Sequence, residues 1–338
     1  MRQSSTLLSD TPIRLWDLEF PGDRTQIHRT RLVYIHLDHL LHHSKIDRDG
    51  RVDGYIIAWL PNEVLIQLLR RGEVVTAVAM ADTGRRVEPI AQVLARMRQE
   101  TERADLAFVQ GPEGLLRYMY GGCSGPLQRR LVDAAEPGLL FAGLQHERFT
   151  GILELISDAT VNYFRFADGK FQDGYFAGRR TDEPIGHFVE RLMHPGADGA
   201  RRTLVATTFP EPAELPAQAP PALVESYRDL FWRITESAEG QVPGEALKRA
   251  HRLRDALQPT HAVLAAIGVA RDRDPVAVVA SPLELTWALA DWTLQLLEQL
   301  EVIAPGVAPV VLKEATREQR FVLQKAGFYQ RLAWTVAW

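Results

Sequence analysis

The stretch that decides the fold occurs twice in this chain. Residues 54–78 read GYIIAWLPNEVLIQLLRRGEVVTAV, and residues 151–175 read GILELISDATVNYFRFADGKFQDGY. A second shared block follows each of them: GRRVEPIAQVLARM from Gly84, and GRRTDEPIGHFVERLM from Gly178. Because two blocks recur in the same order with nearly the same gap, the sequence predicts an internal duplication.

Each copy has the pattern of three strands followed by a helix. The apolar and β-branched content is typical of a sheet with one buried face. Arg71-Gly72 and Asp168-Gly169 predict tight hairpin turns, because glycine tolerates a positive φ. Pro89 and Pro184 suit the first position of the following helix. The predicted strands are 55–60, 64–70 and 73–79 in copy one, and 152–156, 161–167 and 170–177 in copy two.

Further elements are predicted on either side of each sheet. We expect a helix before it, at 32–43 or 127–145, and a short strand after it, at 106–109 or 203–208. The copies then extend over 25–122 and 127–209, and we expect them to pack face to face or to pair their sheets. This is an α+β fold of two similar modules, each with a short antiparallel sheet flanked by helices.

The remainder of the chain is predicted to be a Pro/Ala-rich linker followed by a mostly α-helical domain. Residues 210–222 read PEPAELPAQAPPA, which is typical of a stiff, extended linker. Residues 223–338 hold several helical patterns and five of the seven tryptophans. Trp334 and Trp338 lie in an apolar C-terminal stretch, and we interpret them as a candidate partner interface, with docking onto their own domain as the alternative.

Composition limits the classes of function. The net charge of −4 and pI near 6.2 argue against a protein built to bind nucleic acid. With Cys123 as the single cysteine, no disulfide can form within the chain and no thiolate cluster can hold a metal. We expect a cytoplasmic protein without a signal peptide or membrane span.

Three polar features could carry chemistry, and each has a plainer interpretation. His36, His39 and His43 share one helix face and could bind a metal, but a polar helix surface is favoured. Residues 47–54 resemble a calcium loop, but Ile56 stands where the bidentate glutamate is needed, so a turn is favoured. Cys123 has no local base and is interpreted as part of a connection between the copies. We therefore predict no catalytic residue, metal or cofactor.

The paired Gly-Arg-Arg motifs are the most informative polar feature. Arg85-Arg86 and Arg179-Arg180 are expected in equivalent loops, each shortly before a helix. Guanidinium groups near free helix amides could bind phosphate or a carboxylate of a partner. The alternative is a solvated loop inherited from one ancestral module.

The second copy resembles the PATAN-type domain, a bacterial signalling module. The resemblance rests on Gly151-Ile152-Leu153, on the hairpin Phe166 to Lys170, on Tyr175 to Gly178, and on the following helix. Gly174-Tyr175 departs from the family pattern, which has a small-residue end to that strand. Copy one is similar but more diverged. The resemblance implies a non-catalytic adaptor, often encoded beside response-regulator receivers or small GTPases.

Two functions follow as hypotheses from different classes. The first is a non-enzymatic scaffold for protein–protein interaction in bacterial signal transduction, with a receiver domain or small GTPase as partner and homodimerisation left open. The alternative is a module that binds a phosphate-containing ligand or nucleic acid through the paired Gly-Arg-Arg motifs, which the acidic charge balance disfavours.

Overall fold

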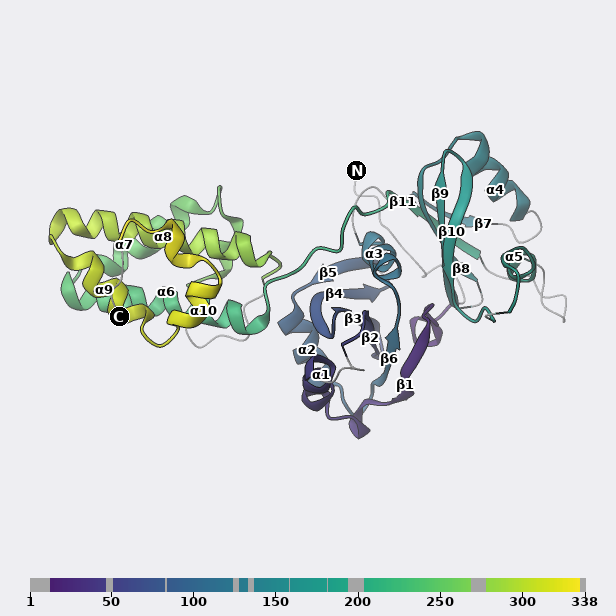
Figure 1. Cartoon of the computed structure of the whole chain (residues 1–338), viewed down its shortest axis with the longest axis horizontal. Coiled ribbons are helices and arrows are strands. Elements are labelled where there is room, and N and C mark those ends of the chain that lie inside the picture. Colours follow the sequence, from purple (N-terminus) through teal and green to yellow (C-terminus); the bar gives the residue numbers. More distant parts are fainter. Residues whose placement is uncertain are drawn as a thin grey trace. The chain divides into compact units, whose positions relative to one another are not determined.

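The computed structural model describes residues 13–46, 51–82, 84–123, 128–132, 137–157, 159–180, 182–193, 204–268 and 278–334. The chain divides into two compact units, the first comprising residues 1–88 and 93–215 and the second residues 89–92 and 216–338. The first unit holds two antiparallel sheets, and the second is built from helices (Figure 1). The predicted α+β class is confirmed.

Copy one forms a six-stranded sheet in the order β1-β6-β2-β3-β4-β5. Its strands are β1 (Arg24–Arg31), β2 (Gly54–Trp59), β3 (Glu63–Arg70), β4 (Glu73–Ala81), β5 (Gly84–Glu88) and β6 (Asp105–Gln110). Its helices are α1 (Leu37–Ile46), α2 (Ile90–Gln99) and α3 (Glu113–Gly121). Short 3-10 helices span Leu15–Asp17 and Leu32–Tyr34.

Copy two forms a five-stranded sheet in the order β10-β9-β8-β11-β7. Its strands are β7 (Gln128–Val132), β8 (Gly151–Ser157), β9 (Thr160–Ala167), β10 (Lys170–Phe176) and β11 (Leu204–Phe209). Its helices are α4 (Pro137–His146) and α5 (Ile185–Met193). Each of these elements has a counterpart at the same place in copy one. The described part of copy two differs in lacking counterparts of β5 and α3.

Both central hairpins turn in the same way. Arg71 and Gly72 have φ angles of 51° and 75°, and Asp168 and Gly169 have 51° and 74°. Two successive positive φ angles make the tight turn that matches the twist of antiparallel strands. Gly169 is required because a Cβ there would lie 2.7 Å from the Gln145 carbonyl oxygen. The duplication thus extends to backbone conformation.

Three expectations need correction. The helix expected at 32–43 is a 3-10 turn followed by α1, and the helix expected at 127–145 is β7 followed by α4. The sheets have two buried faces instead of one, since every residue of β2 and of β8 is buried. A strand buried on both faces shows a continuous apolar run without alternation.

One face of each sheet belongs to a core that the two copies share. Tyr55, Ile57 and Ile66 enter this core from copy one, and Ile156 and Val161 enter it from copy two. The side chains Leu115, Leu116 and Met119 of α3 lie in the same core. Of the two expected arrangements, face-to-face packing and pairing of the sheets, the structure has the first. The opposite face of the second sheet packs on α4 and α5 through Leu140, Leu144, Phe188 and Leu192.

An N-terminal strap, residues 13–23, holds both copies. Leu15 and Leu18 are buried in the shared core. The carbonyl oxygen of Leu18 accepts a hydrogen bond from Trp59 Nε1 of copy one at 3.0 Å. Glu19 pairs with copy two, donating to the Ala159 carbonyl at 2.9 Å and accepting from the Val161 amide at 2.8 Å. The strap thus joins two sheets that lie far apart in sequence.

The first residues of the expected linker are packed against copy one. Leu215 is buried in the shared core. Its carbonyl oxygen accepts a hydrogen bond from Arg70 at 3.1 Å, and Arg117 donates to the carbonyls of Pro212 and Ala213. Residues 210–220 form neither helix nor strand. The boundary between the two units falls inside this segment.

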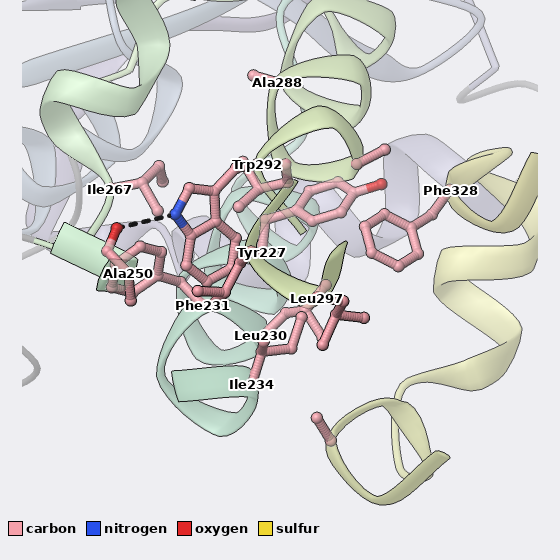
Figure 2. Close-up of a cluster of buried hydrophobic side chains, with 14 of the residues drawn as sticks. Tyr227, Leu230, Phe231, Ile234, Ala250, Ile267, Ala288, Trp292, Leu297 and Phe328 are labelled. Carbon is pink, nitrogen blue, oxygen red and sulfur yellow. Dashed lines mark hydrogen bonds between the residues drawn. The ribbon is translucent and has the colours of Figure 1, made fainter. Parts of the chain in front are cut away.

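The second unit is a helical bundle. Its helices are α6 (Pro221–Gln241), α7 (Ala246–Leu257), α8 (Pro282–Ile303), α9 (Val307–Thr316) and α10 (Arg320–Lys325), with 3-10 turns at Ala262–Ala266 and Phe328–Arg331. Ser281 caps α8 by accepting a hydrogen bond from the Glu284 amide. Figure 2 shows the centre of the bundle, where Trp292 of α8 stacks on Phe231 of α6 and donates to the Ala250 carbonyl at 3.1 Å.

Truncation of Phe231 should strongly destabilise the helical bundle. Phe231 is fully buried, so Phe231→Ala removes a large apolar contact and leaves a cavity, at a cost of about 3–5 kcal/mol in the free energy of unfolding. Native-state hydrogen exchange of α6 and α8 measures this unit separately. The matched control Phe321→Ala, at a side chain 69% exposed, should change the value by less than about 0.5 kcal/mol. Equal effects of the two substitutions would contradict the packing.

Candidate functional site

Arg85 lies in a strand and is buried, contrary to the expected loop. It belongs to β5, and its side chain is 2% exposed. Its Nη1 donates to the carboxylate of Glu154 in β8, which is 3% exposed, and to the Tyr163 hydroxyl of β9 at 3.3 Å. Burial by itself would lower the pKa of Arg85, but the Glu154 carboxylate, Tyr163 and Cys123 together outweigh burial, so the pKa is raised. Arg85 is therefore a charged group that links the two sheets.

Arg86 points to a different set of partners on copy one. It pairs with Glu88 of the same strand and lies 3.9 Å from a carboxylate oxygen of Glu63. Arg96 of α2 joins the same group, with 2.8 Å to Glu63 and 3.5 Å to Glu88. Arg86 lies in β5 instead of the expected loop, within a local network of two arginines and two glutamates.

Arg179 and Arg180 lie in the irregular segment between β10 and α5. The Nε and Nη2 of Arg179 both donate to the Glu183 carbonyl oxygen, at 3.0 and 2.8 Å. Arg180 is 79% exposed and lies 3.4 Å from Asp182, which is also exposed. Of the four predicted arginines, these two face a pocket. The structure does not bring the two Gly-Arg-Arg motifs together or give them equivalent surroundings.

The pocket that Arg179 and Arg180 line has a volume of about 360 Å³. It lies between the end of the N-terminal strap and the second half of β10. Its lining residues are Pro21, Gly22, Asp23, Gly174, Tyr175, Phe176, Arg179 and Arg180. The net charge of this lining is positive, because two arginines face one aspartate.

Three of the lining residues, 174–176, correspond to the part of β4 along which β5 pairs in copy one. There, β5 runs along β4, with Ala77 beside Glu88, Val78 beside Val87 and Ala79 beside Arg86. When the hairpin glycines Gly72 and Gly169 are aligned, the three β4 residues correspond to Gly174, Tyr175 and Phe176. Since β10 is the last strand of its sheet, this stretch has no strand beside it among the described residues. We call residues 174–176 of β10 the open edge.

A length difference explains the open edge. From the hairpin glycine to the glycine of Gly-Arg-Arg there are 12 residues in copy one, Gly72 to Gly84, and 9 in copy two, Gly169 to Gly178. The shorter connection has no room for the turn that reverses the chain between β4 and β5. This difference is visible in the sequence. It could have indicated the open edge, which the prediction of equivalent loops missed.

Glu154 and Tyr163 were also missed as functional residues. Both stand inside apolar strands, at positions that Ile57 and Ile66 fill in copy one. A single acidic residue in the run GILELIS was the available signal, because a buried carboxylate needs a partner. The partner could not be named from the sequence, since Arg85 is 69 residues away.

Cys123 lies beside the buried ion pair. Its side chain is partly buried and packs against the shared core. Burial raises the pKa of the thiol to about 12, although the nearby Arg85 charge acts in the opposite direction. The thiol is therefore protonated at neutral pH. This environment is the opposite of the electropositive, exposed surroundings that activate a catalytic cysteine.

The histidine cluster of α1 is described by the structure, whereas the calcium-like loop is described only in part. His36 and His39 stack on each other with ring centroids 3.8 Å apart. Within the described residues, no three histidine, cysteine, aspartate or glutamate side chains are close enough to hold a metal ion. Residues 47–50 of the calcium-like loop lie outside the described residues. None of the described helices is both long enough and apolar enough to cross a membrane.

Of the two C-terminal tryptophans proposed as a partner interface, the structure describes Trp334. Trp334 is partly buried and packs on the helical core, which agrees with docking onto its own domain. Trp338 lies outside the described residues. Among the described tryptophans of this unit, Trp287 of α8 is 43% exposed, and the Arg331 guanidinium covers its ring at 4.8 Å.

Loss of the Glu154 charge should destabilise the first unit. Glu154→Gln leaves the buried Arg85 charge without its counter-ion, so we expect a loss of about 3–5 kcal/mol in the free energy of unfolding. Hydrogen exchange of β5 and β8 measures it. In the control Asp168→Asn, which breaks the exposed pair with Arg148, stability should hardly change. The double variant Arg85→Met, Glu154→Leu should recover most of the lost stability, because it removes both buried charges. If Glu154→Gln does not destabilise the first unit, the pairing of Arg85 with Glu154 is wrong.

Cys123 should resist alkylation in the folded protein. With a pKa of about 12, about one thiol in 10⁴ is ionised at pH 8, against roughly a quarter in the unfolded chain. The rate of carbamidomethylation by iodoacetamide, followed by mass spectrometry, should therefore be orders of magnitude lower without urea than with it. Similar rates under the two conditions would show that the thiol is not held in this environment.

Comparisons with known proteins do not assign the chain to a family. No protein-family model matches it, and no curated protein or solved structure matches it at a significant level. The resemblance of the repeats to PATAN-type modules stays a prediction.

Proposed function

We propose that this protein is a non-enzymatic adaptor that binds a protein partner at the open edge of copy two. The observation that carries the proposal is that, within the part of the chain that the structure describes, no strand corresponding to β5 lies beside β10. An edge strand presents unpaired amide and carbonyl groups, which are a template for a strand from another chain. Copy one shows that the same edge of this module accepts a strand, because β5 occupies it there.

The class of partner is proposed from the resemblance to PATAN-type modules. It favours bacterial signal transduction, with a response-regulator receiver or a small GTPase as partner. The rigid attachment of copy two supports an adaptor role, because the strap and the Arg85–Glu154 pair both fix the sheet that carries the open edge. The single cysteine favours a cytoplasmic location.

Phosphate or nucleic-acid binding through the paired motifs has less support. Such binding would use Arg85 and Arg179 in equivalent roles. Arg85 already faces Glu154 inside the shared core, and Arg179 is bonded to the Glu183 carbonyl. No specific observation in the structure favours this second function.

Site-specific crosslinking tests the adaptor function. A photo-reactive amino acid at Gln172, an exposed residue of β10, should give a reproducible adduct with one protein in cells that natively express the chain. The same group at Gln99, an exposed residue of α2, is the control. Mass spectrometry identifies the adducts, and the purified partner should then bind the purified chain. The proposal fails if position 172 gives no adduct above that at position 99.

A further inference from the structure

We propose that the open edge takes up an extended, acidic segment of the partner as an added antiparallel strand, with its carboxylates facing Arg179 and Arg180. This inference rests on the adaptor function and specifies the chemistry of the partner. It is carried by three observations: the internal comparison with copy one, the regular register of the open edge, and the charge of the pocket beside it.

The internal comparison fixes the geometry of the added strand. In copy one, five residues of β5 lie antiparallel to β4 between Ala77 and Ala81. The equivalent backbone in copy two begins at Gly174 and runs toward Gly178. Strand β10 ends at Phe176 and residues 177 and 178 form a turn, so about three residues of an added segment can pair with the open edge. The segment would lie in the pocket between β10 and the end of the N-terminal strap.

Residues 174–176 of the open edge themselves carry no bulge, charged side chain or proline. Natural edges are shielded by bulges, charges or proline. The edge strand β1 has two irregularities in its pairing with β6, and it carries Arg24, Arg29 and Arg31. In β10 the irregularity lies between Phe171 and Asp173, before the open edge. From Asp173 to Phe176 the pairing with β9 is regular, so the outer side is straight enough to accept a strand.

Charge selects the kind of segment. Arg180 is largely exposed, and Nη1 of Arg179 takes no part in the two bonds to Glu183. A guanidinium group with free donors binds a carboxylate in a bidentate way. Asp23 lines the pocket from the N-terminal strap and is negatively charged, whereas Arg179 and Arg180 are positively charged. An acidic residue is thus favoured near the arginines, and the β5 sequence of copy one, with two arginines, is disfavoured.

Two synthetic peptides test this inference. One has the sequence of residues 82–91, which contains β5, and the other has both of its arginines replaced by glutamate. Titration of the isotope-labelled full chain, followed by the amide NMR signals of Gly174, Tyr175 and Phe176, measures their binding. We expect the glutamate peptide to shift these signals and to bind about tenfold or more tightly than the arginine peptide, since two charge contacts change sign.

Variants of the chain separate charge from strand addition. Arg180→Glu should reverse the preference between the two peptides, whereas Arg252→Glu, at an exposed residue of α7, should leave it unchanged. The inference is overturned if the glutamate peptide shifts none of the three signals, or if both peptides bind equally and Arg180→Glu has no effect. If either of these two outcomes were found together with a crosslink at Gln172, the adaptor function would still be supported. Only the inference that the partner adds an acidic strand would be rejected.

Discussion

The buried pair of Arg85 and Glu154 is the interaction on which the arrangement of the two sheets depends. A pair of opposite charges inside an apolar core contributes little net stability, because both charges lose their hydration. Any arrangement that separates them leaves an isolated charge without water, which is far more costly. The pair therefore selects among ways of packing two similar sheets. Of the registers in which the faces could meet, the observed one brings Glu154 of β8 to Arg85 of β5.

The same pair makes the two copies unequal. Arg179 is the counterpart of Arg85, and Ile57 is the counterpart of Glu154. If the two copies packed symmetrically, Arg179 would therefore face Ile57, which cannot accept a hydrogen bond through its side chain. Arg179 instead bonds locally to the Glu183 carbonyl. In copy one the anchored arginine keeps its segment in place as strand β5. In copy two a shorter connection and an unanchored arginine leave the segment irregular, and the neighbouring strand becomes an edge. Copy one thus carries the additional strand β5 along β4, whereas in the described part of copy two the equivalent strand β10 is itself the edge of its sheet.

The sequence was sufficient for the elements whose signal is local. The strands β2 to β4 and β8 to β10 were predicted because burial on both faces gives long apolar runs between turn residues. The edge strand β1, with the sequence RTQIHRTR, was missed because its exposed residues are polar and its pairing partner β6 lies about eighty residues away. The candidate site was harder to predict. Arg85 and Arg179 each stand between a glycine and an arginine in the sequence. Their surroundings differ because only Arg85 meets the distant Glu154, and because the connection before Arg179 is shorter.

The N-terminal strap has a consequence for how the chain can acquire its structure during synthesis. Leu15 and Leu18 are made early, but Ala159 and Val161, to which Glu19 bonds, emerge from the ribosome about 140 residues later. Until then Tyr55, Ile57 and Ile66 of copy one have no second sheet to cover them. At the usual rate of elongation this interval lasts roughly 7–30 seconds. During this interval an aromatic and aliphatic surface of copy one lacks the sheet that covers it in the folded protein.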